Sequence, residues 1–192
     1  MTEKMGRAFT GIAYSDSVKA IQDTLNSRAI NARMEVVGQP RNALDDNLKE
    51  FISQRNSFYL GTASKEGEPY IQHRGGDRGF IEIMDECTLR FPDYPGNKQY
   101  ITLGNLSENR RAFIFMIDYE MKSRVKFWGH AEVENLTGED RAILFHIEAW
   151  DINCSKHLPD YFSLETVRQA TARLNKRIEE LEAEVVALKS SQ

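Results

Sequence analysis

A run of large polar side chains leads into two glycines within a stretch that has strand character. Residues 72–76 read Gln-His-Arg-Gly-Gly. Successive residues of a strand face opposite sides, so three consecutive polar residues depart from a simple half-buried strand. Paired glycines let a ligand approach the backbone, and the Arg74 guanidinium can grip a phosphate with two parallel hydrogen bonds. The alternative is an exposed edge strand whose side chains are only solvated.

A second polar cluster spans residues 93–99, which read Asp-Tyr-Pro-Gly-Asn-Lys-Gln. Its Pro-Gly pair predicts a turn, after which Asn97, Lys98 and Gln99 open the next element. A turn into a helix start offers free N–H groups to an anion, and Lys98 would add positive charge. Residues 104–109 repeat this turn chemistry and are interpreted as the end of that element. A plain polar turn is the alternative.

Two cations share one face of a third segment. Arg124 and Lys126 alternate with Val125 and Phe127. Like charges on one strand face repel unless an anion lies between them or water solvates them, and solvation is the commoner case. Trp128, on the same face as the cations, is either a stacking surface or a packed residue.

A possible metal or nucleophile pair lies near the end of the strand-rich region. Cys154 and His157 are three residues apart. A zinc site needs three or four ligands, and no other Cys or His has a suggestive spacing, so no metal site is predicted. A Cys–His nucleophile pair needs a lowered thiol pKa and an orienting group, and the sequence indicates neither.

Residues 1–56 are predicted to form a helical lead-in. Val18, Ile21 and Leu25 have helical spacing, with Asp16 or Ser17 as the cap. A second amphipathic helix, capped by Asn42, is indicated by Leu44, Leu48, Phe51 and Ile52.

Residues 57–162 carry the two-residue period of short strands. Strands are predicted at 58–63, 69–74, 80–84, 88–91, 112–117, 124–134 and 142–150. The last of these could be a short helix, but its β-branched and aromatic residues favour a strand. Six or seven strands separated by turns predict an antiparallel barrel.

Residues 163–192 are predicted to form one long helix, with Ser163 as its N-cap. Its apolar residues recur at alternating spacings of four and three, which is a heptad pattern. The seam consists of Val167, Thr171, Leu174, Ile178, Leu181, Val185 and Leu188. It would pack either on the chain's own barrel or against a second copy of the helix.

Length and composition narrow the class of protein. The chain has 192 residues and a formal charge of −4, from 25 Lys and Arg against 29 Asp and Glu. This mild acidity argues against general nucleic-acid binding. No apolar run reaches the length of about 18 residues that spans a membrane, and the N-terminus lacks the apolar core of a signal peptide. Two cysteines fit a reducing compartment, so we expect a cytoplasmic protein.

Taken together, these clusters resemble the FMN-binding split-barrel family related to pyridoxamine 5′-phosphate oxidase. The match covers roughly residues 50–160 and is closest to the flavin-nucleotide-binding branch rather than to the oxidase. It is carried by LGTAS at 60–64, GEPYIQHRGG at 67–76, FPDYPGNKQY at 91–100, GNL at 104–106, RVKFWGHAEV at 124–133 and EAWDINC at 148–154.

This resemblance implies a mainly β (α+β) fold, a six-stranded antiparallel split barrel with N-terminal helices and a long C-terminal helix. It also implies an obligate homodimer with FMN at the subunit interface. The phosphate and ribityl chain would be held by Gln72, His73, Arg74 and Gly75 on one strand and by Asn97, Lys98 and Gln99 in a later loop. Arg124 would lie near the flavin ring, and Trp150 would match a Trp that approaches the ring from the partner subunit.

The chain also departs from the oxidase. Residues 156–160 replace an arginine-rich stretch that binds the pyridoxal substrate, and a heptad helix replaces the oxidase's C-terminal tail. The strand motif at 72–76 differs as well. Oxidation of pyridoxamine phosphate is therefore not expected.

Two functions remain open from the sequence. The first is an FMN flavoprotein that transfers hydride or electrons to an unknown small substrate. The second is a non-enzymatic flavin carrier, sensor or assembly module, which the heptad helix suggests. Adaptation of the barrel to haem or a deazaflavin is a further possibility, and no catalytic residue is named.

Overall fold

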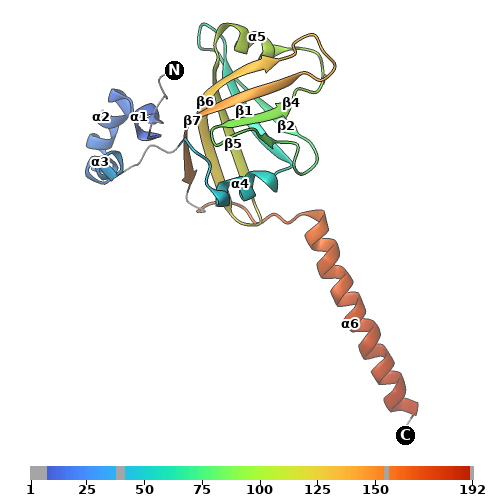
Figure 1. Cartoon of the computed structure of the whole chain (residues 1–192). Helices are drawn as coiled ribbons and strands as arrows, with labels where there is room; N and C mark the ends of the chain where they lie inside the picture. The colour runs from blue at the N-terminus through green and yellow to red at the C-terminus, as the bar shows by residue number, and fades with distance from the viewer. Residues whose placement is uncertain (1–7, 38–41, 154–155, 191–192) are drawn as a thin grey trace. The chain divides into compact units, whose positions relative to one another are not determined.

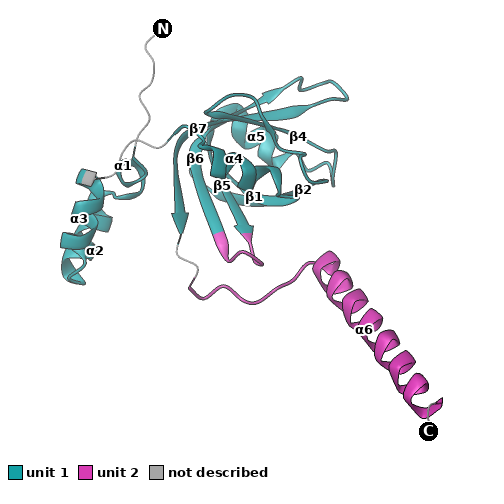
Figure 2. Ribbon diagram, turned by 60° about the horizontal axis from the view of Figure 1, so that its bottom comes forward, with its two compact units in different colours: residues 1–117, 124–154 teal, residues 118–123, 155–192 magenta. Residues whose placement is uncertain are grey.

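The structure is a computed structural model that describes residues 8–37, 42–153 and 156–190. The chain divides into two compact units, shown in Figure 2. The first comprises residues 1–117 and 124–154, and the second comprises residues 118–123 and 155–192. None of the described helices combines the length and the apolar character that crossing a membrane requires.

The first unit is built on one antiparallel sheet of seven strands, in the order β2-β1-β5-β6-β7-β4-β3 (Figure 1). The strands are β1 (Ser57–Ala63), β2 (Pro69–Gly75), β3 (Glu82–Ile83), β4 (Thr88–Pro92), β5 (Arg111–Asp118), β6 (Ser123–Glu134) and β7 (Ala142–Asn153). The fold is a split barrel of mainly β character, as predicted. The sheet has one strand more than the six that the resemblance implied, and the additional β3 is only two residues long.

The core fills the space enclosed by this sheet. Buried and less buried positions alternate along β6, where Val125 and Phe127 face inward between the flanking cations. The predicted alternation of this segment is therefore confirmed. The segment 142–150 belongs to a strand and not to a helix, because Ile143, Phe145 and Ile147 supply every second residue of the same core.

A β-bulge in this sheet depends on a glycine. The pairing of β6 with β7 shifts register between Trp128 and Gly129. A Cβ atom at Gly129 would overlap the carbonyl oxygen of His146, so no other residue fits here without a shift of the backbone. Glycine at this position is what allows the two strands to approach.

Residues 8–37 and 42–56 of the lead-in contain four helices: α1 (Thr10–Ala13), α2 (Asp16–Thr24), α3 (Arg28–Val37) and α4 (Asp46–Ser53). Of these, α2 and α4 were predicted. The predicted caps are wrong. Ser15 caps α2, where it accepts a hydrogen bond from Val18 N at 3.3 Å, and Asp45 caps α4, where it accepts one from Leu48 N at 2.8 Å. A cap bonds the amide three residues later, and Asn42 is too far from Leu48 along the chain to do so.

Helix α5 (Ile101–Glu108) follows the second polar cluster. The prediction that residues 104–109 end this element in a turn is wrong for most of that stretch, because Gly104 to Glu108 lie within the helix. The helix ends at Asn109, whose backbone is extended and whose side chain accepts a hydrogen bond from Arg111 N at 3.1 Å. Its buried side chains are Thr102, Asn105 and Leu106.

The second unit contains α6 (Leu164–Ser190). Ser163 caps it as predicted, since its hydroxyl accepts a hydrogen bond from Thr166 N at 3.1 Å. No side chain of α6 is buried. The described residues of the second unit therefore leave the heptad seam uncovered.

Candidate functional site

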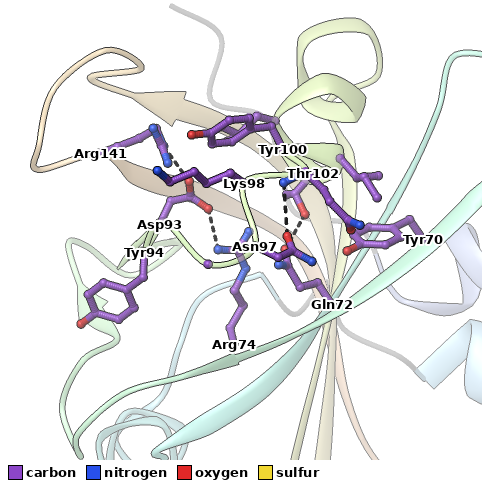
Figure 3. Close-up of a pocket in the computed structure, with 14 residues that line it drawn as sticks. Tyr70, Gln72, Arg74, Asp93, Tyr94, Asn97, Lys98, Tyr100, Thr102 and Arg141 are labelled. Carbon is purple, nitrogen blue, oxygen red and sulfur yellow. Dashed lines mark hydrogen bonds and ion pairs between the residues drawn. The ribbon is translucent and has the colours of Figure 1, made fainter.

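A small polar pocket lies where β2, the segment after β4 and the start of α5 meet (Figure 3). β2 contributes Gln72 and Arg74, which share one face of the strand because they are two residues apart. The loop after β4 contributes most of residues 93–100, and Arg141 enters from the position before β7. Three segments far apart in the sequence thus surround one cavity.

The centre of this pocket is a carboxylate shared by two guanidinium groups. Arg74 Nη1 lies 2.5 Å from Asp93 Oδ1, and Arg141 Nε lies 2.6 Å from Asp93 Oδ2. The side chains of Arg74, Asp93 and Arg141 are 8%, 7% and 14% exposed. Buried charges are retained in folded proteins when they are paired in this way. The triad therefore holds two arginines at fixed positions on the wall of the pocket.

Arg74 has donors that the triad does not use. Its Nε and Nη2 atoms are buried and have no hydrogen-bond partner among the residues that the structure describes. A buried donor left without a partner costs about 1–3 kcal/mol. An oxyanion placed against this guanidinium would remove that cost, so Arg74 fits a phosphate or carboxylate ligand.

The loop that closes the pocket has an unusual backbone. Lys98 and Tyr100 both have a positive φ, of 60° and 55°, although neither is glycine. The Asn97 side chain accepts a hydrogen bond from Gln99 N at 3.2 Å and so forms a local turn. Strained backbone of this kind is retained where the surroundings fix it, often at ligand sites.

Helix α5 begins at the pocket without a side-chain cap. Its N-cap position is Tyr100, which makes no capping hydrogen bond, and its first turn carries no acidic residue. Thr102 Oγ1 donates to Gln72 Oε1 at 2.8 Å, which ties the helix start to β2. An uncapped helix N-terminus presents amide hydrogens and a partial positive charge to an anion.

Size and charge both favour a compact anion. The cavity measures about 30 Å³, which leaves room for a small group and is too small to enclose a three-ring flavin. Its described lining carries three cations, Arg74, Lys98 and Arg141, against the single carboxylate of Asp93. The Arg141 guanidinium also lies over the Tyr100 ring, 5.5 Å from its centroid, which holds both side chains in place.

Five of the nine predicted cofactor-binding residues line this pocket. They are Gln72, Arg74, Asn97, Lys98 and Gln99. The two sequence clusters that were interpreted separately, one on a strand and one in a loop, are therefore brought together. β2 is an edge strand, as that alternative has it, but Arg74 on it is buried and not simply solvated.

The other four predicted residues lie elsewhere. His73 faces the opposite side of β2, where its ring packs edge-on against Tyr59 at 5.7 Å. Gly75 is beside His73 and outside the pocket lining. Arg124 is paired in register with Asn153, near the end of the β6–β7 ladder. Trp150 is only 5% exposed, and its indole Nε1 donates to the Ala43 carbonyl oxygen at 3.0 Å.

Sequence reasoning missed the roles of Asp93, Thr102 and Arg141. Asp93 was noted only as part of a turn, and Arg141 was not singled out. The antiparallel register of β4 and β7 pairs Pro92 with Ala142, so the next residues, Asp93 and Arg141, are forced opposite each other. The only available signal was a pair of opposite charges flanking two strands, and it becomes informative only when the pairing is known.

The described residues outside this pocket offer little further chemistry. No group of three or more His, Cys, Asp or Glu side chains within the described ranges could hold a metal ion. Burial, reinforced by the nearby carboxylates of Asp85 and Glu86, raises the pKa of the Cys87 thiol and makes it a poor nucleophile. Cys154 lies outside the described residues, so the pairing of Cys154 with His157, considered in the sequence and not predicted, does too.

Comparison with known proteins identifies the family. The sequence model of the pyridoxamine 5′-phosphate oxidase family matches residues 44–188, which is most of the chain. The chain belongs to this family. A search of curated protein sequences finds no match.

Several solved structures are similar to the chain at low identity. HupZ from Group A Streptococcus is 15% identical with a TM-score of 0.46, and the match covers 62% of this chain and 99% of HupZ. A pyridoxamine 5′-phosphate oxidase homologue from Lactobacillus delbrueckii is 17% identical with a TM-score of 0.45, covering 57% and 94%. HutZ, a haem storage protein from Vibrio cholerae, is 16% identical with a TM-score of 0.40, covering 57% and 94%.

Proposed function

We propose that the chain is an FMN-binding flavoprotein that uses this pocket to hold the phosphate of FMN. The observation that carries the proposal is the buried Arg74 guanidinium, which is fixed by Asp93 and still has two donors without a described partner. A phosphate offers the oxygens that such donors require. Membership of a family that contains flavoproteins supports the same ligand.

Each part of the pocket has a distinct role in this proposal. Arg74 and Lys98 would contact the phosphate, and the uncapped start of α5 would add amide donors. Gln72 and Asn97 would contact the ribityl chain. The isoalloxazine ring would lie outside the cavity, because the cavity is too small to enclose it. Bound FMN would supply hydride and electron transfer, while the chain fixes the cofactor and controls its surroundings.

The ring is proposed to lie at the interface of a homodimer, as in the family to which the chain belongs. Arg124 and His73 lie outside the pocket in one chain, so they could reach the ring only from another direction or from the partner. We leave Trp150 out of the proposed site, because its side chain is part of the core and its indole is already hydrogen-bonded.

A carrier role is a second candidate, and one observation favours it. Among the described residues that line the pocket, the only carboxylate is Asp93, and both of its oxygens are held by arginines. The pocket therefore binds an anion without offering a carboxylate as an acid or base. Haem is less compatible with this pocket, because its described lining has no His, Cys or Met and offers haem iron only the phenols of Tyr70, Tyr94 and Tyr100.

The proposal is tested by comparing FMN with riboflavin, which lacks the phosphate. Wild-type protein should bind FMN at one molecule per chain and riboflavin far more weakly, measured by quenching of flavin fluorescence. Arg74→Ala should weaken FMN binding roughly 10- to 100-fold, because a charge-assisted hydrogen bond of about 1.5–3 kcal/mol is lost, and should leave riboflavin binding unchanged. Arg78→Ala, at an exposed arginine outside the pocket, is the matched control.

Wild-type FMN affinity in Arg74→Ala would remove the phosphate assignment. Purified protein that carries haem, or that neither contains nor binds flavin, would remove the flavoprotein proposal altogether. Reduction of the bound FMN by NADH or NADPH with turnover distinguishes the oxidoreductase from the carrier.

A further inference from the structure

The seam side of α6 is an apolar surface that the proposed flavin site does not use and that its own unit does not cover. Apart from Thr171, the residues of the predicted seam are hydrophobic, and each of these is between 43% and 69% exposed. Leaving six large apolar side chains on one stripe of a helix in water is unfavourable. The stripe therefore requires an occupant.

The pattern of residue types indicates what that occupant is. Placing the seam on a heptad puts Thr171, Ile178 and Val185 at a positions, and puts Val167, Leu174, Leu181 and Leu188 at d positions. β-Branched residues at a with leucine at d favour two parallel strands. Thr171 does not interrupt this arrangement, because its hydroxyl donates to its own helix at Val167 O (2.9 Å) and leaves its methyl group available.

The charged residues beside the seam favour a second copy of the same helix, parallel and in register. In such a pair each g residue faces the e residue five positions later on the partner. Arg177 would then face the partner's Glu182, and Glu184 would face the partner's Lys189. Both contacts join opposite charges, and symmetry makes each of them twice.

The antiparallel arrangement is less favourable. It would place e residues against e residues and g residues against g residues, so Arg168 would lie near the partner's Lys189 and Arg177 near the partner's Glu184. The first contact is repulsive and the second attractive, and symmetry makes each twice, so the antiparallel pair lacks the net attraction of the parallel one. The charge pattern therefore favours a second copy of α6 as the partner and a parallel orientation of the two helices.

An anionic membrane surface is a poor match for this helix. Amphipathic helices that bind such membranes are rich in Lys and Arg on the polar face. The polar residues of α6 are balanced instead, with five cations and five carboxylates: Arg168, Arg173, Lys176, Arg177 and Lys189 against Glu165, Glu179, Glu180, Glu182 and Glu184.

We propose that α6 forms a parallel, in-register, two-stranded coiled coil with α6 of a second copy of this chain. The proposal concerns residues 167–188 only and holds whether or not the barrel binds FMN. It makes the tail a self-association element, with its orientation set by the pairs from Arg177 to the partner's Glu182 and from Glu184 to the partner's Lys189.

Disulfide trapping in the full chain tests this proposal. In a background where Cys87 and Cys154 are replaced by serine, Leu174→Cys places thiols at facing d positions. Lys176→Cys places them two residues away on the outer side of the helix. Mild oxidation should cross-link Leu174→Cys at least roughly 10-fold faster than Lys176→Cys, because only the d thiols meet within disulfide distance. Equal rates at both positions would overturn the coiled coil, even if the barrels associate.

Orientation and register are tested by two further variants. A mixture of Leu174→Cys and Val185→Cys chains should give little mixed product, whereas an antiparallel pair would form it preferentially and overturn the parallel arrangement. Arg177→Glu should slow cross-linking at position 174, and adding Glu182→Arg should restore it. Residues 177 and 182 are not neighbours on one helix, so restoration reports contact between chains. Failure to restore the rate would contradict the assigned register.

Discussion

The pocket beside α5 and the seam of α6 depart from ordinary burial in opposite ways. The pocket holds charged side chains that are almost fully buried, whereas α6 holds large apolar side chains that are exposed. In the pocket, the charges are paired inside the chain, and only selected Arg74 donors have no described partner. On α6, no apolar side chain of the seam is buried within the chain.

This difference shows which side chains find their interaction partners within one chain and which do not. The triad is a structural element as much as a binding element, because Arg74, Asp93 and Arg141 must satisfy one another before any ligand binds. The seam is left open within its own unit, and the proposed second copy of α6 would cover it. Changes in the pocket should therefore affect folding of a single chain, and changes on the seam should affect association.

The strongest test of this contrast is Asp93→Asn. The substitution keeps the side-chain shape and removes the charge that holds two buried guanidinium groups together, so the free energy of unfolding should fall by about 3–5 kcal/mol. Urea denaturation followed by tryptophan fluorescence measures this, since both tryptophans lie in barrel strands. Inorganic phosphate should recover part of the loss by replacing the missing anion.

Asp77→Asn is the control for that measurement, because Asp77 is exposed in the loop after β2. Equal stability of Asp93→Asn and Asp77→Asn would mean that the triad does not stabilise the barrel.

A pair of glycine substitutions tests the barrel away from the charges. Gly129→Ala should lower stability by about 1–3 kcal/mol or more, because its Cβ would meet the His146 carbonyl oxygen. Gly104→Ala should raise it by roughly 0.5–1 kcal/mol, because a Cβ at this position inside α5 would meet no neighbouring atom and alanine is a better helix former. Thermal unfolding of both variants gives the comparison, and shifts of the same sign would contradict it.

The smallest effect on the barrel is expected from Ile178→Asp. Surface substitutions usually change stability by less than about 0.5 kcal/mol, so barrel unfolding should be nearly unchanged while cross-linking through Leu174→Cys is lost. Lys176→Asp, on the outer side of the same helix, should change neither. A large loss of barrel stability in Ile178→Asp would mean that the seam is covered within its own chain.

Local pattern predicted most of the strands and both of the amphipathic helices α2 and α4. The β-branched and aromatic alternation of 142–150 was sufficient to identify a strand, because that alternation is imposed by the same core that the strand packs against. The seam of α6 could also be predicted from local sequence, because its heptad period depends only on residues that are neighbours along one helix.

Features that depend on pairing between distant segments could not be predicted from the sequence. The opposition of Asp93 and Arg141 follows from the β4–β7 register, which no local pattern encodes. The assignment of Trp150 to a partner's flavin ring missed its packing in the core, because a tryptophan next to polar residues has the same local sequence in either role. The sequence prediction ended helix α5 too early, because Gly104 and Asn105 are residues typical of turns. In the structure, contacts between the helix and the barrel override that local preference. One such contact joins Asn105 Nδ2 to Thr62 Oγ1 at 3.0 Å.

The hydrogen bond from Trp150 to Ala43 also sets a limit on how far the chain can be shortened. It joins residues 107 positions apart, and the adjacent Leu44 N donates to the Glu86 carbonyl oxygen at 2.7 Å. Ala43 and Leu44, just before α4, therefore connect β7 to the turn that precedes β4 through these two hydrogen bonds. A fragment that starts after them would lose both hydrogen bonds, so we expect it to be less stable than one that includes Ala43 and Leu44.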